Sequence, residues 1–241
     1  MVLSEYCFFF DLDGTLLDLA PTPDDVSVED GLLAVLQKIA EETDGAVAIV
    51  SGRSIEFIDR LLPGHHLTVA GLHGAEIRSH GSTVIFAGDA SSAFNKAREK
   101  TQHSVKMIAD LVFEDKGRAF AVHYRQTPHQ EDLVRQLMSD ASQIAGPEFE
   151  LQAGKFVIEL KPSASNKGTA IETLMSIEPF KGRRPIAAGD DHTDEAMFQV
   201  VNRLNGASVR VGPPNQHFKT SATLMAETPQ AFRKWIRKLI E

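Results

Sequence analysis

Residues 6–15 read Tyr-Cys-Phe-Phe-Phe-Asp-Leu-Asp-Gly-Thr, an apolar run that ends in two carboxylates one residue apart. Such a run is typical of a strand buried on both faces, as in a parallel sheet covered by helices. Ligands of these sheets bind outside the carboxyl ends of the strands, where Asp11 and Asp13 emerge. Two like charges this close tolerate each other best beside a bound cation. The stretch predicts a functional site, and the simpler alternative is an Asp-Gly turn after a strand.

Length, charge and cysteine content restrict the class of protein. The chain has 241 residues, and its formal net charge of −8 argues against a nucleic-acid binder with a broad basic face. Cys7 is the only cysteine and lies in the predicted buried strand, so no intrachain disulfide can form. No apolar stretch reaches the ~20 residues that span a bilayer, and the amino terminus lacks a signal-peptide pattern. We therefore expect a cytoplasmic globular protein without a membrane partner.

Strand and helix patterns alternate in the two outer parts of the chain. Further apolar runs predict strands at 46–50, 67–70, 185–188 and 208–211. Apolar residues at helical spacing predict helices over 29–43, 195–202 and 229–241. A further helix is expected after residues 51–53, ending at about residue 62. Alternation of this kind favours an α/β fold, with a Rossmann-like parallel sheet covered by helices on both faces.

The middle of the chain has a different pattern of helix, hairpin, helix and hairpin. Turn signals at 115–117 and 153–154 lie between strand patterns, and a helix is expected over 129–145. The simplest account is an α+β cap domain at 80–162, inserted into a core formed by 1–79 and 163–241. In its last strand, Phe156, Ile158 and Leu160 alternate with Lys155, Val157, Glu159 and Lys161. If the insert covers the crevice of the core, that polar face becomes the lid of an active site; an ordinary solvated face is the alternative.

A second acidic motif, Gly-Asp-Asp-His-Thr-Asp-Glu at 189–195, also follows a predicted strand and precedes a helix. Acidic residues stabilise the positive end of a helix, but four acids within six residues exceed what capping requires. Mg²⁺ prefers oxygen ligands of this kind, so the motif favours a metal site shared with Asp11. Ser51 follows the second core strand and could cradle a phosphate or cap a helix. Lys167 could place a cation over a phosphate or lie on the surface.

The order Asp-x-Asp, Ser, Lys, Gly-Asp-Asp resembles that of the haloacid dehalogenase superfamily of phosphohydrolases. The resemblance implies that Asp11 attacks phosphorus and that Asp13 is the general acid and base. It also implies that Ser51 and Lys167 stabilise the charge of the transferring phosphoryl group. The Mg²⁺ ligands implied are the Asp11 and Asp190 carboxylates and the Asp13 backbone carbonyl, supported by Asp191 and Asp194.

Segments 70–76, 123–125 and 154–162, together with 189–195, are similar to those of the trehalose-6-phosphate phosphatase family. The resemblance implies a sugar-phosphate substrate and assigns Lys155 and Glu159 to the hydroxyls of the sugar. His73 and Arg125 are further candidates for substrate binding, and Glu76 is a weaker one. The sequence leaves Arg53 open between a phosphate contact and an ion pair with an acid.

Alternative functions share the same core chemistry. A phosphatase for another sugar phosphate, such as sucrose 6-phosphate or mannosyl-3-phosphoglycerate, would differ in its cap residues, and a phosphosugar mutase would return the phosphate to the sugar. A sensor that binds sugar phosphate without turnover would have no need of a nucleophile at Asp11. The expected partner is a small molecule, and we expect the chain to be a monomer.

Overall fold

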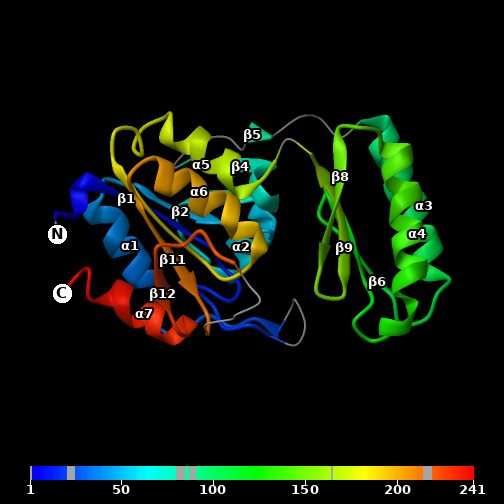
Figure 1. Cartoon of the computed structure of the whole chain (residues 1–241), viewed down its shortest axis with the longest axis horizontal. Helices are drawn as coiled ribbons and strands as arrows, with labels where there is room; N and C mark the ends of the chain where they lie inside the picture. Colours follow the sequence, from blue (N-terminus) through cyan, green and yellow to red (C-terminus); the bar gives the residue numbers. More distant parts are fainter. Residues whose placement is uncertain (1, 21–24, 80–84, 87–90, 164, 214–218) are drawn as a thin grey trace. The chain divides into compact units, whose positions relative to one another are not determined.

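The computed structural model describes residues 2–20, 25–79, 85–86, 91–163, 165–213 and 219–241 (Figure 1). The chain divides into two compact units, each with its own sheet. The first unit combines Met1–Ile85 with Asn166–Glu241, and the second is Phe86–Ser165.

In the described residues, the first unit contains an eight-stranded sheet in the order β12-β11-β10-β1-β2-β3-β4-β5. β1 lies between β10 and β2 and is parallel to both, whereas β4 is antiparallel to β3. The carboxyl ends of β1, β2 and β10 therefore meet at one edge of the sheet. The strands are β1 (Tyr6–Phe10), β2 (Val47–Val50), β3 (Thr68–Gly71), β4 (Glu76–Arg78), β5 (Ile85–Phe86), β10 (Arg184–Gly189), β11 (Ala207–Val211) and β12 (Leu224–Ala226).

Helices cover both faces of this sheet, as predicted for a parallel core (Figure 1). Phe8 and Phe10 of β1 pack with residues of α1 (Leu32–Glu42), α2 (Ile55–Leu61) and α7 (Pro229–Arg237). Cys7 and Phe9 point to the other face and pack with residues of α5 (Lys167–Met175) and α6 (Glu195–Arg203). Because successive side chains of a strand point to opposite faces, β1 is apolar throughout and buried on both sides.

The second unit is an antiparallel sheet in the order β6-β7-β9-β8, with two helices packed on one face. Phe120, Val122, Ile158 and Leu160 point toward those helices, as the alternation predicts. The other face carries Glu114, His123 and Glu159, with Ala121 and Val157 between them. The elements are α3 (Ser92–Lys106), β6 (Val112–Asp115), β7 (Phe120–His123), α4 (Glu131–Ala145), β8 (Phe149–Gly154) and β9 (Val157–Pro162).

The second hairpin of this unit turns two residues later than the sequence predicts. β8 continues through Gly154, which pairs with Val157, so the turn consists of Lys155 and Phe156. Phe156 takes a left-handed backbone conformation (φ 62°), and its ring lies against Tyr124 with the centroids 6.0 Å apart. We attribute the shift to this packing, because burial of a large ring offsets the strain of a left-handed residue. Lys155 is therefore a turn residue and does not share the strand face of Glu159.

Candidate active site

Asp11 and Asp190 meet because they follow neighbouring parallel strands. The backbone N–H of Asp11 donates to the carbonyl of Ala188 (2.9 Å), which continues the pairing of β1 with β10 to the edge of the sheet. Gly14 makes room for the second carboxylate, since a Cβ built on Gly14 would lie 2.3 Å from Asp190 Oδ2. Gly14 also has φ +79°, where glycine is favoured. Gly14 is thus required both by its own left-handed backbone conformation and by the position of the Asp190 carboxylate.

Asp194 is fully buried and organises the second acidic motif. It ends a short 3₁₀ helix (His192–Asp194), and its Oδ2 accepts the backbone N–H groups of Asp190 (2.8 Å) and Asp191 (3.0 Å). Asp191 caps the same turn by accepting the N–H of Thr193 (2.8 Å). These bonds fix the backbone from which the Asp190 side chain projects.

Lys167 links the two acidic motifs. It is the first residue of α5 and is buried, and its Nζ lies 2.6 Å from both Asp11 Oδ1 and Asp194 Oδ1. Burial alone would lower the Lys167 pKa, but the Asp11 and Asp194 carboxylates raise it above its ordinary value. The lysine is therefore a fixed positive charge beside the predicted nucleophile, and the surface-lysine alternative is wrong.

Carboxylates outnumber cations in this cluster. Oxygen atoms of Asp11, Asp190 and Asp194 all lie within 4.8 Å of one another. Burial, opposed by Lys167 and reinforced by the neighbouring acids, raises the Asp11 pKa well above its usual range. Burial and the Asp194 carboxylate raise the pKa of Asp190 to about 7. A buried group of acids with excess negative charge is a suitable donor set for a hard divalent cation, so this cluster could hold a metal.

Ser51 and Arg53 follow β2, the strand on the other side of β1. Ser51 is buried, and its Oγ accepts the backbone N–H of Arg53 (3.1 Å). The helix cap lies three residues later, because Ser54 accepts the N–H of Phe57 (3.2 Å) at the start of α2. The alternative in which Ser51 is the helix cap is therefore wrong. Ser51 lies in a loop at the same edge of the sheet as Asp11.

Arg53 forms an ion pair with Asp13. Its Nε lies 2.8 Å from Asp13 Oδ2, and its Nη2 lies 2.9 Å from Oδ1. This fork-to-fork geometry confirms the ion pair with an acid, one of the two contacts that the sequence leaves open for Arg53.

His73 and Glu76 border the loop after β2. Leu72 and His73 both have left-handed backbones (φ 49° and 56°), an uncommon conformation that is concentrated at functional sites. A Cβ on Gly52 would lie 2.7 Å from His73 Nε2, so the imidazole lies directly over that glycine. Glu76 accepts the N–H of Ile55 (2.5 Å) and so holds the start of α2. Its contacts give Glu76 a structural role.

Glu159, in the second unit, is buried on the polar face of the sheet. Lys116 Nζ lies 2.7 Å from its Oε2, and among the described residues its buried Oε1 accepts no hydrogen bond. The same lysine lies 3.9 Å from Glu114 Oε2, and Glu114 is 2.7 Å from His123 Nε2. Lys155 is exposed in the turn.

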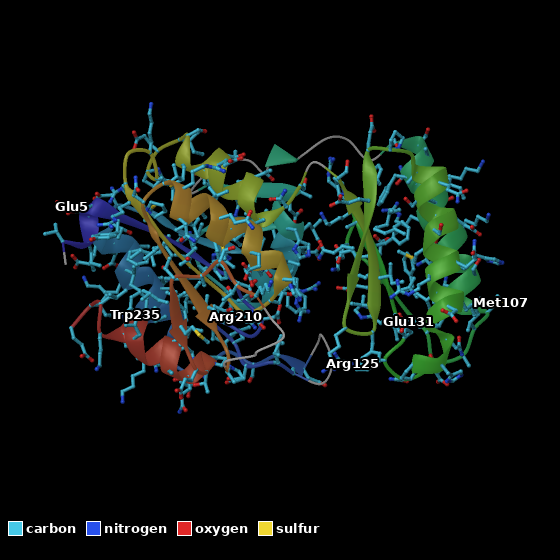
Figure 2. The ribbon with its side chains drawn as sticks, viewed as in Figure 1. Glu5, Met107, Arg125, Glu131, Arg210 and Trp235 are labelled. Carbon is cyan, nitrogen blue, oxygen red and sulfur yellow. The ribbon has the colours of Figure 1, made fainter. Side chains whose placement is uncertain are left out.

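Arg125 is exposed just beyond β7 (Figure 2). The structure therefore places Arg125 and Lys155 in the same unit as Glu159, and His73 in the other unit.

Comparison with known proteins gives the family of the chain. The family model for trehalose-phosphatase matches residues 9–229. The chain belongs to the trehalose-phosphatase family. It is 43% identical to a probable trehalose-phosphate phosphatase of Sinorhizobium fredii, over 88% of this chain and 80% of the relative. It is 44% identical to a trehalose-6-phosphate phosphatase of Escherichia coli, over 87% of this chain and 78% of the relative.

A solved structure with the same fold supports this assignment to the trehalose-phosphatase family. The crystal structure of a trehalose-6-phosphate phosphatase related protein superimposes with a TM-score of 0.81 and 28% identity, covering 97% of this chain and 96% of that one. Both the α/β core and the antiparallel unit therefore have counterparts in a related protein. No helix among the described residues has the length and apolar character needed to cross a membrane.

Sequence reasoning missed two charged residues that the fold of this trehalose-phosphatase family member places beside Glu159. Lys116 is part of a turn signal, and Glu114 is part of the strand before it. The signal that could have found Glu114 is alternation, because Glu114 pairs with Ala121, which in turn pairs with Glu159. Lys116 carries no comparable signal, since its side chain reaches back from the turn.

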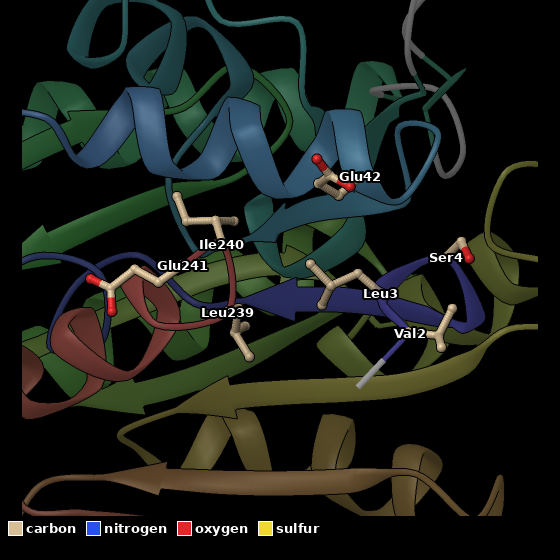
Figure 3. A pocket seen from close by; sticks show the side chains of 7 residues that line it. All are labelled: Val2, Leu3, Ser4, Glu42, Leu239, Ile240 and Glu241. Atoms are coloured by element: carbon tan, nitrogen blue, oxygen red, sulfur yellow. The ribbon is translucent and has the colours of Figure 1, made fainter.

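A separate hollow lies near the amino-terminal end of β1, whereas the acidic cluster of Asp11, Asp190 and Asp194 lies at its carboxyl-terminal end (Figure 3). It has a volume of about 460 Å³. Its lining residues are Val2, Leu3, Ser4, Glu42, Leu239, Ile240 and Glu241. It contains none of the predicted site residues, so the chemistry of the chain is expected at the acidic cluster.

Proposed function

We propose that this chain is a trehalose-6-phosphate phosphatase, which releases trehalose and phosphate. The observation that carries the proposal is the buried cluster in which Lys167 contacts both Asp11 and Asp194 beside Asp190. A metal-binding acidic cluster with a fixed lysine suits the transfer of an anionic phosphoryl group. The substrate is inferred from the 43–44% identity to proteins named as phosphatases of trehalose phosphate.

Asp11 is the proposed nucleophile. Its carboxylate oxygen attacks phosphorus, the bond from phosphorus to the sugar oxygen breaks, and Asp13 protonates that oxygen as trehalose departs. Asp13 then takes a proton from water, which attacks the aspartyl-phosphate and releases phosphate. Lys167 supports this reaction because it stabilises negative charge at Asp11 and on the phosphoryl oxygens. Ser51 is proposed to donate a hydrogen bond to the phosphate.

Mg²⁺ is the proposed cofactor, and the donor set fits it because the cluster offers only oxygen ligands. Asp11 and Asp190 would hold the ion through their carboxylates, and Asp13 through its backbone carbonyl. Asp194 and Asp191 would support these ligands, as the bonds of Asp194 to the N–H groups of 190 and 191 suggest. When bound, the ion would neutralise charge on the phosphate and orient it for in-line attack.

The second unit is proposed to recognise the sugar, as a cap domain with the predicted bounds 80–162. Its best-supported residue is Glu159. Its buried Oε1 accepts no hydrogen bond from any residue that the structure describes, which is costly, and a sugar hydroxyl would supply a donor. Lys116 could bind a neighbouring hydroxyl from its place beside Glu159. Lys155, Arg125 and His73 stay in the proposed substrate-binding set.

The test of the reaction is a phosphate-release assay with Mg²⁺ across a panel of sugar phosphates. Trehalose 6-phosphate is expected to be the best substrate, and Asp11→Asn to abolish turnover while leaving the circular dichroism spectrum unchanged. If the enzyme preferred sucrose 6-phosphate or mannosyl-3-phosphoglycerate, that sugar phosphate would be assigned as the substrate in place of trehalose 6-phosphate. An isomeric sugar phosphate as product would indicate a mutase, and binding without turnover would indicate a sensor. A monomeric state and a cytoplasmic location stay predictions.

Sugar recognition has its own test. Glu159→Ala should lower kcat/KM for trehalose 6-phosphate far more than for 4-nitrophenyl phosphate, which lacks the sugar. Glu150→Ala is the matched control, because Glu150 lies in the same sheet and also forms an ion pair with a lysine. Glu150 pairs with Lys161 (2.5 Å), as Glu159 pairs with Lys116. Equal losses on both substrates in Glu159→Ala would remove Glu159 from the recognition of the sugar.

A further inference from the structure

The ion pair between Arg53 and Asp13 lies at the proposed active site, but Arg53 takes no part in the proposed steps of phosphate transfer. Its two contacts, Nε to Oδ2 at 2.8 Å and Nη2 to Oδ1 at 2.9 Å, engage both carboxylate oxygens of the proposed general acid and base. The pair is largely shielded, with 13% of the Arg53 side chain and 27% of the Asp13 side chain exposed. A pair in this environment keeps its geometry better than a fully solvated one.

Arg53 is itself held on several sides. Its backbone N–H donates to Ser51 Oγ (3.1 Å), and its carbonyl accepts the N–H of Leu72 (3.0 Å). Its guanidinium carbon lies 4.3 Å from the centroid of the Phe57 ring. The side chain is thus anchored at both its backbone and its charged end, so it can serve as a rigid support for a neighbouring group.

We propose that Arg53 is a positioning residue for proton transfer, which holds the Asp13 carboxylate in the orientation from which it exchanges protons with the substrate and with water. The inference rests on the proposed function. Proton transfer requires heavy atoms within about 2.6–3.2 Å, and an aspartate without a fixed partner turns about its side-chain bonds. A guanidinium fork on both oxygens fixes that rotation, while each oxygen keeps a second lone pair for the proton that moves.

The leaving group separates this role from a general loss of structure. Trehalose departs as an alcohol and needs a proton from Asp13, whereas 4-nitrophenolate departs readily without one. In single-turnover experiments, Arg53→Met should slow the release of trehalose by about 10- to 100-fold, part of the 10²–10⁴-fold typical of general acid catalysis. Release of 4-nitrophenol in the first turnover should fall by less than about threefold, and KM for trehalose 6-phosphate should change little.

Matched variants control for the loss of an ion pair. Arg78 makes a similar fork on Asp59, with contacts of 2.7 and 2.6 Å, in the same unit. Arg78→Met should leave both rates near those of the wild type. Arg53→Lys keeps the charge without the fork and should recover part of the trehalose rate. Guanidinium added to Arg53→Ala should raise the rate of trehalose release of that variant. Such a rescue requires a folded protein, so it excludes misfolding as the cause of the loss.

A double-mutant cycle completes the test. If Arg53 acts through Asp13, Arg53→Met should have no further effect on trehalose release in the background of Asp13→Asn. Additive losses, or an equal slowing of both leaving groups in Arg53→Met, would overturn the positioning role. Neither result would touch the proposed function, which is tested separately by phosphate release in the wild type across the sugar-phosphate panel and by the loss of turnover in Asp11→Asn.

Discussion

Substitution of Gly14 by alanine tests the link between the first motif and the proposed metal site. A Cβ at this position would lie 2.3, 2.5 and 2.9 Å from Oδ2, Cγ and Oδ1 of Asp190. Contacts under 3.0 Å are essentially absent for real Cβ atoms, and all three atoms of the carboxyl group fall below that value. Rotation of the carboxylate in place cannot relieve the clash, so the group must leave its position.

The expected effect has two separable parts. Alanine in a left-handed conformation costs about 1–2 kcal/mol of folding free energy, and overpacking adds about 1–3 kcal/mol. Displacement of Asp190 should also weaken Mg²⁺ binding by about 10- to 100-fold, because Mg²⁺ demands near-ideal octahedral geometry. Gly64→Ala is the matched control, since Gly64 has φ +77° against +79° at Gly14 and, among the described residues other than its chain neighbours, no atom lies within 4 Å of its built Cβ. Gly64→Ala should lose only the folding free energy that a left-handed alanine costs, about 1–2 kcal/mol, and should bind Mg²⁺ as tightly as the wild type.

Three measurements decide the result: urea unfolding for stability, isothermal titration calorimetry for Mg²⁺ binding, and phosphate release for activity. Gly14→Ala should be less stable than Gly64→Ala and should bind Mg²⁺ more weakly, with a corresponding loss of activity. Wild-type Mg²⁺ affinity in Gly14→Ala would refute the reasoning, because it would show that the Asp190 carboxylate does not need its present position. Equal stability of the two variants would refute the steric part.

Three further changes test other parts of the structure. Lys116→Met should reduce kcat/KM for trehalose 6-phosphate about tenfold or more and spare 4-nitrophenyl phosphate, if Lys116 acts with Glu159; equal effects would contradict this. Asp194→Asn should lower the free energy of unfolding by about 3 kcal/mol, as measured in urea, because its amide cannot accept every donor that the carboxylate accepts. Burial lowers the His65 pKa against the opposing hydrogen bond of Asp59 (2.8 Å), with Arg78 and His66 as the other charged neighbours. The unfolded chain then takes up a proton below about pH 6.5 that the folded chain resists, so stability should fall from pH 7 to 5, more steeply in the wild type than in His65→Gln.

Local patterns in the sequence predicted much of the fold. The strand at 6–10, its parallel neighbours and the helix–hairpin repeat depend on periodicity and turn residues, which are properties of short stretches. For Ser51 the sequence left a phosphate contact and a helix cap open, and the N–H groups of α2 select Ser54 as the cap. One prediction from a local pattern was wrong. The turn at 155–156 was placed two residues too early because its position depends on cross-strand register.

The sequence by itself determined the acidic motifs, the strands that carry them and the edge of the sheet at which they meet, because alternation of apolar strands and helices permits few arrangements. Only the tertiary structure decided which charges share a partner. Lys167 bridges Asp11 and Asp194 across 156 and 27 positions of the chain, and Arg53 selects Asp13 across 40. Such pairs depend on strand register and side-chain reach, to within an ångström, and residue spacing along a chain does not encode distances of that kind.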